Sequence, residues 1–466
     1  MGAPTSPGTQ PSGPTATIRP APAPSVRAFL LWRWPLGAIA AAVLVEAFTS
    51  WLDSRLFTDG RPPQPFDRGG SEDIRAVLTT IASSTVTVLA LVLSMTMVVI
   101  SLAATQLGPR LIRSFLSSRV LKSVISIYAG LFVYSLLVLD SINSDEAAGP
   151  QLLPNIGTTI CLLWATGAVL ALIWYVHHVA WSIQLPQVVA NIAANLTQHI
   201  EATRTEREFA AGDRDPVEVE REWSQRTPSS DVATLVVGVS GYVQQIDHQP
   251  LVDAATRGNA VVSFLVRPGD FVTSGDRIAE ISPASALEAM TGPVEADLDV
   301  GPHRTLDQDL EFAIDQLVEI ALRALSPAIN DTFTGLTCLD WIGTALRSLG
   351  TIPVDRSIHC DGTGAIRVVE RPRSWGRLVQ AGYSKIRQTA AADNPAVAIR
   401  ILESITRLVP TATSVAHRAA LIDEADMCVA QAATGNWVSS DLVALATRHQ
   451  ALQALLDPPE PGPAPA

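Results

Sequence analysis

The sequence predicts a mixed fold: a four-helix transmembrane bundle, then a small, barrel-sandwich-like β module, then an all-α cytosolic domain. Three observations lead to this prediction. Of 466 residues, 47% are hydrophobic and only 17% are charged, and the apolar excess lies before residue 182. From Asp231 the apolar residues recur with a period of two, which is typical of strands. Beyond about Thr305 the helical period returns.

The amino-terminal third of the chain is predicted to cross the membrane. Residues 1–25 are rich in Pro, Thr, Gly and Ala and are expected to form a disordered tail. No short basic region leads into a brief apolar core, so a cleavable signal peptide is not expected. The transmembrane domain covers 26–182. Because a span needs about 20 apolar residues, four spans are predicted, at about 34–52, 79–106, 123–139 and 152–176.

The basic residues of the short loops predict the orientation. The loop after the second span contains Arg110, Arg113, Arg119 and Lys122, whereas the loop at 140–150 contains no basic residue. Basic loops stay on the cytoplasmic side. The sequence therefore predicts a multi-pass protein of the bacterial inner membrane with both termini in the cytoplasm, and the arginines of the first loop are the exception.

The second span has hydroxyl side chains along one helical face. No charged residue lies between Ala76 and Pro109. The face consists of Thr80, Ser84, Thr87, Ser94, Ser101 and Thr105. The favoured interpretation is a helix–helix interface, where small residues allow close approach. The alternative is a water-lined conduit in which hydroxyls replace part of an ion's hydration. Both interpretations predict a bundle or a homo-oligomer in the lipid bilayer.

The end of the second span is marked by a helix break. Gly108 and Pro109 should kink or end the helix, because proline lacks the amide hydrogen and clashes one turn back. Arg110 and Arg113 then follow at the cytosolic mouth. An anchor that binds anionic lipid headgroups is the favoured role. The alternative role of these arginines is a gate or an anion-selecting ring at a pore mouth.

Other ionisable residues of the transmembrane domain have simpler explanations. Glu46 is the one carboxylate inside a predicted span, and such a group is a functional candidate by default. It lies near the outer end, however, so an extended side chain that reaches the interface is favoured. His177 and His178 are adjacent and point in different directions on a helix. An interfacial position is favoured over metal binding there.

The middle of the chain changes from helix to strand. Residues 183–230 are predicted to form a helical connector that ends in a polar linker from Ala211 to Ser230. A β-rich module is predicted at 231–300, because "VATLVVGVSGYVQQID" and "NAVVSFLVRPGDFVTSGDRIAEIS" combine β-branched runs with Gly and Pro-Gly turns.

Residues 301–456 are predicted to be helical. The helix "DQDLEFAIDQLVEIALRAL" should stop at Ser326 and Pro327, with Asn330 and Asp331 as a helix stop and the cap of the next helix. Further helices are predicted at Thr334–Leu349, Ser374–Ala391, Pro395–Leu408, Thr413–Thr434 and Asp441–Leu456. Residues 457–466 are expected to be a disordered tail.

Acidic residues gather at the start of this helical domain: Asp307, Asp309, Glu311, Asp315 and Glu319. Acidic groups stabilise a helix start through its dipole, and Asp315 or Glu319 has the spacing to pair with Arg323. Glu319 has apolar neighbours and is expected to meet an arginine or backbone amides. Because a divalent cation is the less favoured alternative, no metal site is predicted.

Four segments together resemble a known family: "QLGPRLIRSF", "SGYVQQID", "VRPGDFV" and "EIALRALSPAINDTFT". They are similar to a bacterial family of predicted membrane proteins, domain of unknown function 2254, over about Leu30 to Leu456. The last segment is the most specific, and its motif residues are Ser326, Pro327, Asn330 and Asp331. The resemblance implies amino-terminal spans and a soluble carboxy-terminal half, and it implies no activity or catalytic residues.

The segment "VRPGDFVTSGDRIAEI" also looks like a half-motif of biotinyl or lipoyl domains, with Gly269 and Gly275 at the turns. No lysine lies between Lys122 and Lys385, so the carrier lysine is missing and no such cofactor is expected. At most the β scaffold is shared.

Several function classes are disfavoured. A net charge of −12 argues against a nucleic-acid partner. The four cysteines, Cys161, Cys338, Cys360 and Cys428, form no CxxC pair, so reduced core thiols are expected. The sequence has no GxxxxGK[ST], HExxH or GxGxxG motif, and "GVSGY" does not fit a nucleophile elbow. The protein is therefore not expected to be an enzyme, and no catalytic residue or cofactor is predicted.

The function hypothesis is a channel-like or passive transport conduit, oligomeric, with a cytosolic domain. Its architecture is borrowed by analogy from small mechanosensitive channels. The alternative is a membrane scaffold or regulatory protein that binds a cytosolic protein partner, and a membrane enzyme ranks third.

Overall fold

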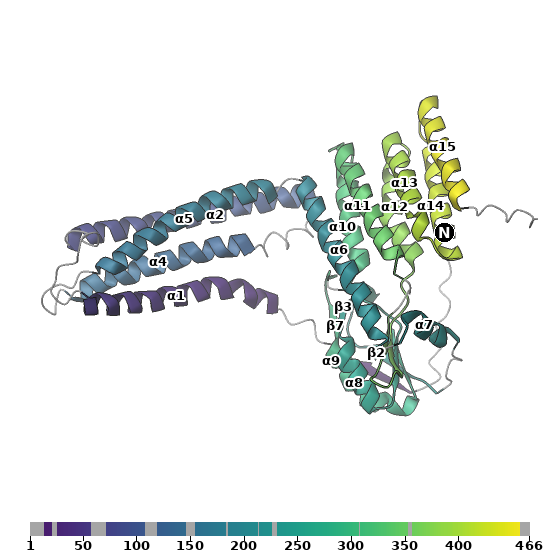
Figure 1. Cartoon of the computed structure of the whole chain (residues 1–466), viewed down its shortest axis with the longest axis horizontal. Helices are drawn as coiled ribbons and strands as arrows, with labels where there is room; N and C mark the ends of the chain where they lie inside the picture. The colour runs from purple at the N-terminus through teal and green to yellow at the C-terminus, as the bar shows by residue number, and fades with distance from the viewer. Residues whose placement is uncertain are drawn as a thin grey trace, which may run out of the picture. The chain divides into compact units, whose positions relative to one another are not determined.

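A computed structural model describes residues 14–20, 26–56, 71–107, 119–145, 154–182, 185–212, 214–225, 231–306, 308–352 and 357–456 (Figure 1). It divides into two compact units, and each is described separately. The bundle unit is Ser25–Gln187, and the mixed unit joins Met1–Pro24 to Val188–Ala466. Gly108, Pro109, Arg110 and Arg113 lie outside the described residues.

The bundle unit contains four long apolar helices. They are α1 (Val26–Leu56), α2 (Ser71–Leu107), α4 (Arg119–Asp145) and α5 (Asn155–Ser182). Each is long and apolar enough to cross a membrane, and the candidate spans are Arg33–Asp53, Ser71–Ser101, Arg119–Ile142 and Asn155–Trp181. By length and composition, these four helices confirm the predicted number of candidate spans.

Helix α4 packs against the other three helices of the bundle. Tyr128 and Tyr134 are buried along it. The Tyr128 hydroxyl donates to the backbone oxygen of Ala168 at 2.8 Å, and the Tyr134 hydroxyl donates to that of Gly157 at 3.2 Å. Buried hydroxyls need such partners, so these bonds fix α4 against α5.

The start of α5 is held by a carboxylate from α1. Asp53 is 5% exposed, and its oxygens accept the backbone N–H groups of Ile156 and Gly157 at 3.2 and 3.4 Å. A negative charge at a helix amino terminus satisfies amides that have no intrahelical partner. Asp53 therefore ties α1 to the first turn of α5.

The mixed unit contains most of α6 (Leu185–Ala210), then α7 (Pro216–Gln225), and two sheets. The six-stranded sheet has the order β1 (Thr15–Ile18), β2 (Ala233–Val237), β6 (Arg277–Ser282), β4 (Val261–Phe264), β9 (Ile366–Val369) and β8 (Ile358–Cys360). The three-stranded sheet has the order β5 (Phe271–Val272), β3 (Gly241–Ile246) and β7 (Leu298–Gly301).

Two helices share one apolar core with these strands. Helix α8 (His248–Arg257) contributes Leu251, and α9 (Leu287–Asp297) contributes Met290 and Val294. These side chains are buried together with Leu235 and Ile281 of the sheet. Burial of alternate residues in β4, where Val262 and Phe264 are buried, agrees with the period of two in the sequence, whereas β2 also buries consecutive residues.

Six further helices follow: α10 (Leu310–Ala324), α11 (Thr332–Gly350), α12 (Trp375–Ala390), α13 (Pro395–Leu408), α14 (Val415–Ala432) and α15 (Ser439–Leu456). Short 3₁₀ turns lie at Ala284–Ala286 and Val409–Thr411. Helix α10 packs on α11 and α12, and α13 packs on α11 and α15 (Figure 1). The predicted bounds of these helices after residue 330 are confirmed to within two residues.

Two predictions about irregular segments are corrected. Strand β1 lies within the tail expected to be disordered, where Thr17 pairs in parallel with Val236 and Ile18 is fully buried. Because prolines surround β1, its β-branched residues are not recognisable as a strand from the sequence. The strand forms one edge of the six-stranded sheet. Helix α7 lies within the expected polar linker and buries Val219. Its apolar residues are too few for the hydrophobic pattern to stand out.

The expectation of an all-α domain over 301–456 is wrong at 357–370. Strands β8 and β9 form an antiparallel hairpin there, and Val262 of β4 pairs in parallel with Val368 of β9. The hairpin extends the sheet of the β module, so that module does not end at residue 300. The barrel-sandwich likeness is not confirmed. Three- and four-residue strands are too short for periodicity to separate them from loops.

Candidate functional site

The hydroxyl face of α2 lies on the outside of its own bundle. Thr80, Ser84, Thr87, Ser94 and Ser101 are all exposed. The opposite side of the same helix buries Ile74, Leu78, Thr85 and Val92 against the other helices. At about 100° per residue the two sets lie on opposite faces. The side chain of Thr105 is outside the described residues.

Local hydrogen bonds partly satisfy this face. Thr80 Oγ1 donates to the backbone oxygen of Ala76 at 2.7 Å, and Thr87 Oγ1 donates to that of Ser83 at 3.0 Å. Ser84 Oγ donates to Ile81 O at 3.0 Å. Bonds to the preceding turn leave the hydroxyl oxygen able to accept from another group.

The family motif forms the corner between α10 and α11. Asn330 has a positive φ of 51°, and its backbone N–H donates to the oxygen of Ser326 at 2.8 Å. Asp331 caps α11, since its carboxylate accepts from the N–H and the hydroxyl of Thr334 at 3.1 and 2.6 Å. The predicted cap at Asp331 is thus confirmed, whereas α10 ends at Ala324, before Asn330. The corner also exposes Phe333, at 84%.

The acidic residues at the start of α10 are paired with cations. Asp309 accepts two hydrogen bonds from Arg304, at 2.7 and 3.0 Å, and also caps α10 through the N–H of Phe312. Asp315 lies between Arg304 and Lys385, at 2.8 and 2.9 Å. Burial opposes the charge on Arg304, but Asp309 and Asp315 raise its pKa above the usual value.

The same region contains two further ion pairs, of which the sequence predicts only the first. Glu319 lies 3.5 Å from Arg323, as predicted, and Glu311 lies 3.4 Å from Arg267. Asp307 is outside the described residues. With the described carboxylates engaged in this way, the cluster is a salt-bridge network rather than a set of free metal ligands.

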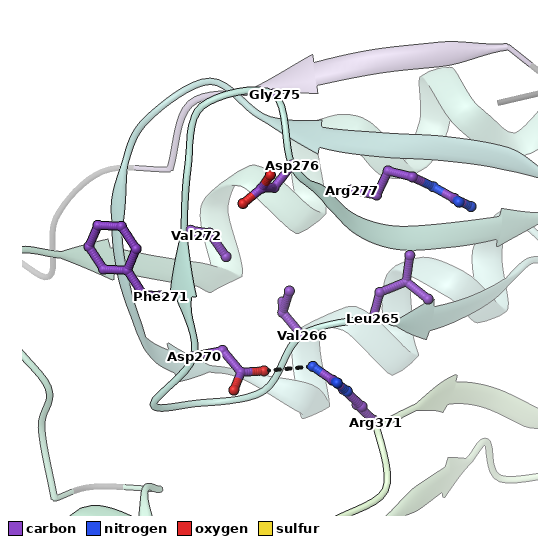
Figure 2. Close-up of a pocket in the computed structure, with 9 residues that line it drawn as sticks. All are labelled: Leu265, Val266, Asp270, Phe271, Val272, Gly275, Asp276, Arg277 and Arg371. Carbon is purple, nitrogen blue, oxygen red and sulfur yellow. Dashed lines mark hydrogen bonds and ion pairs between the residues drawn. The ribbon is translucent and has the colours of Figure 1, made fainter. Parts of the chain in front are cut away.

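An open hollow of about 540 Å³ lies beside strand β5, and Leu265, Val266 and Val272 are among the residues that line it. Figure 2 shows its lining side chains. Two carboxylates that line the hollow form bonds with other residues of the protein. Asp270 forms an ion pair with Arg371 at 3.1 Å (Figure 2), and Asp276 accepts the N–H of Thr273 at 2.7 Å. Since its two carboxylates are already bonded to the protein, the hollow provides no evident pair of reacting groups.

A second polar cluster in the mixed unit combines two histidines and two glutamates. Glu206 lies on α6, His248 begins α8, His359 lies in β8 and Glu370 follows β9. Glu206 Oε1 is 3.1 Å from His248 Nδ1. Glu370 Oε1 is 3.0 Å from His248 Nε2 and 3.2 Å from His359 Nε2. Burial alone lowers the pKa of His248, but Glu370 and Glu206 raise it overall.

Sequence reasoning missed this cluster and assigned no metal ligand. Its members are 11 to 164 residues apart in the chain, and apart from His359 and Glu370 no two of them lie within 40 residues of each other. The two histidines lie in different elements and neither belongs to a motif. Only the unexpected hairpin at 357–370 brings His359 and Glu370 to the start of α8.

Comparison with known proteins identifies the family. The profile described as "Predicted membrane protein (DUF2254)" matches residues 30–407. The chain is also similar to uncharacterised proteins of Mycobacterium bovis and Mycobacterium tuberculosis, each 25% identical over 391 residues, which cover 83% of this chain and 71% of the relative. No solved structure matches. Because the profile covers most of the chain, the protein belongs to this family of predicted membrane proteins, DUF2254.

Proposed function

We propose that the protein is a homo-oligomeric, channel-like conduit, in which the hydroxyl face of α2 meets neighbouring copies and borders the path. The main support for the proposal is where the hydroxyl face lies on α2 relative to the bundle. Its five hydroxyl residues with described side chains are exposed in the single chain, on the side of α2 opposite to the one that packs in the bundle. Hydroxyl residues at transmembrane interfaces favour close approach between helices.

A path between copies also agrees with the small size of the bundle. The core of the four helices is filled by large side chains such as Tyr134 and Leu131, both nearly inaccessible. A path through the centre of one bundle would need these side chains to move. Hydroxyls that can still accept hydrogen bonds are suitable for contact with water or a hydrated ion.

The distribution of basic residues supports an inner-membrane location with cytoplasmic termini. Arg119 and Lys122 lie at the start of α4, and Arg110 and Arg113 precede them. In the proposed orientation, the mixed unit lies in the cytoplasm.

Reconstitution of the full chain in planar bilayers tests the conduit. We expect current under voltage or membrane tension, together with an oligomer in detergent by native mass spectrometry. Ser94→Leu and Ser101→Leu should lower the conductance or dissociate the oligomer, because each replaces a hydroxyl by a larger apolar group. Leu93→Met, at an exposed position about 80–100° around α2 from Ser94 and Ser101, is the matched control. A monomer without current would refute the proposal.

A second candidate is a membrane scaffold that binds a protein partner. It is favoured by the family motif, which exposes Ile329 and Phe333 at 50% and 84%. A photo-crosslinking amino acid at position 333 would test it in cells. A defined crosslink to one protein, lost when the crosslinker is moved to exposed Arg347, supports the scaffold. Crosslinks only to lipid or solvent oppose it.

A further inference from the structure

The two histidines and two glutamates of the mixed unit converge on one point. One donor atom from each of Glu206, His248, His359 and Glu370 lies within 4.8 Å of the others. These residues come from α6, α8, β8 and the residue after β9. Four separate elements thus direct nitrogen and oxygen donors to the same place.

The distances between the donors are suited to a small cation. Ligand atoms 2.0–2.2 Å from a tetrahedral metal ion are about 3.4 Å apart. Glu370 Oε1 lies 3.0 Å from His248 Nε2 and 3.2 Å from His359 Nε2, whereas Glu206 Oε1 lies 3.1 Å from the other ring nitrogen, His248 Nδ1. The rings of His248 and His359 are stacked, with centroids 4.2 Å apart and an interplanar angle of 16°. Stacking holds both Nε2 atoms toward the same oxygen of Glu370.

One buried nitrogen in this cluster has no hydrogen-bond partner. His248 is 8% exposed and His359 is 7% exposed. His248 Nε2 is 3.0 Å from Glu370 Oε1, yet it makes no hydrogen bond. A buried polar atom without a partner is destabilising. A cation between this nitrogen and the carboxylate would give the nitrogen a partner.

The charges also favour a divalent ion. The two carboxylates bring negative charge to a cluster whose central residue, His248, is almost fully buried. A divalent cation carries the opposite charge. Uncompensated buried charge is expensive.

The kinds of ligand atom in the cluster indicate which class of metal ion it would bind. Imidazole nitrogens favour zinc and neighbouring transition metals over magnesium or calcium, and carboxylates complete such sites. The neighbouring thiol of Cys360 is not among the converging donor atoms. Cys360 packs against the apolar cluster around Val219.

We propose that Glu206, His248, His359 and Glu370 form a binding site for a divalent transition-metal ion of the zinc type. His248, His359 and Glu370 are supplied by the sheet and α8, and Glu206 closes the site from α6, with 42% of its side chain exposed. The ion therefore holds α6 against the sheet. Helix α6 begins three residues after the last candidate span helix, α5, ends. The proposal does not depend on the conduit.

Zinc binding to the full chain in detergent tests the site. After chelator treatment, titration with Zn²⁺ followed by calorimetry should give one tight site per chain, and elemental analysis should find one zinc retained after desalting. Co²⁺ in place of zinc should give the visible absorption of a four-coordinate nitrogen–oxygen site. His359→Gln and Glu370→Gln should lower the affinity by more than the roughly 10–100-fold that outer-shell changes cost.

Two variants keep the test independent of folding. Glu206→Gln removes a half-exposed ligand and should weaken zinc binding without changing the circular dichroism of the metal-free chain. His303→Gln changes a histidine outside the cluster and should bind zinc like the unmodified chain. If no zinc is retained, or if His359→Gln and Glu206→Gln bind as tightly as the unmodified chain, the proposal is overturned and the cluster holds a proton instead.

Discussion

Arg387 and Glu424 form an ion pair in the interior of the helical layer. Arg387 Nε donates to Glu424 Oε1 at 2.8 Å, and Glu424 is completely buried. The second carboxylate oxygen accepts the hydroxyl of Ser384 at 2.8 Å. The pair joins α12 to α14, and its carboxylate is fully bonded. A buried charge of this kind is tolerable only while its partner is present.

We therefore expect Glu424→Gln to destabilise the protein strongly. The change leaves the guanidinium of Arg387 buried without a counter-charge, and loss of one partner of a buried pair costs about 3–5 kcal/mol. The free energy of unfolding of the full chain in detergent, measured by pulse proteolysis in urea, is the suitable quantity.

The double variant Arg387→Met, Glu424→Leu separates charge from packing. Apolar residues of similar volume often replace a buried pair with little loss of stability. We expect it to be more stable than Glu424→Gln. If Glu424→Gln is as stable as the unmodified chain, the ion pair between Arg387 and Glu424 does not stabilise the fold as we expect.

The glycine of the RPGD turn should be intolerant of any side chain. Gly269 has a φ of 97°, and a Cβ there would lie 2.3 Å from Asp309 Oδ2. Gly269→Ala would displace the carboxylate that binds Arg304 and caps α10. We expect a lower melting temperature and a larger loss of stability than the backbone strain alone produces.

Gly275→Ala is the matched control for that substitution. Gly275 has a nearly equal φ of 99°, but a Cβ there meets nothing within 4 Å. Backbone strain in the left-handed region costs about 1–2 kcal/mol at either position. The difference between the two variants therefore measures the contact with Asp309. Equal losses of stability would show that this contact is unimportant.

The family motif gives a third prediction, about the α10–α11 corner. Asp331→Ala removes the cap of α11 and should cost about 0.5–2 kcal/mol in the free energy of unfolding. Asn330→Gly should be nearly neutral, whereas Asn330→Val should destabilise, because its φ of 51° is unfavourable for a β-branched residue. Thermal unfolding of the three variants checks this order. An Asn330→Val chain as stable as Asn330→Gly would contradict it.

Local patterns in the sequence predict the helices well and the polar cluster not at all. The segment 395–408 begins with a proline and repeats its apolar residues at helical spacing, and the structure places α13 at those bounds. By contrast, His359 and Glu370 depend on a short hairpin whose strands have three and four residues. Its position beside β4 is a long-range pairing, which periodicity within a segment does not encode.

The outward position of the α2 hydroxyl face is also a feature that the sequence does not predict. Spacing alone places Ser94 and Ser101 on one side of a helix. It does not say whether that side meets the chain's own helices, because this depends on which face carries the tighter apolar packing. The burial of Leu78 and Val92 decides it.

The cysteines provide the last prediction, because their environments differ. Cys338 and Cys428 are fully buried in the helical layer, and burial raises the pKa of each thiol to about 12. At pH 8 only about one in ten thousand of these thiols is ionised, and only the thiolate reacts with iodoacetamide. Cys360 is half-buried and remains within reach of reagent.

In the folded full chain at pH 8, iodoacetamide should therefore modify Cys360 and leave Cys338 and Cys428 unmodified, as measured by mass spectrometry of peptides. Raising the pH to 10 still ionises only about one in a hundred of the buried thiols, so their protection should persist until urea unfolds the helices. Cys360→Ser gives the baseline for the two buried thiols. Modification of Cys338 at the rate of Cys360 would mean that α11 opens readily, because ionisation within the folded helix is too rare to explain it.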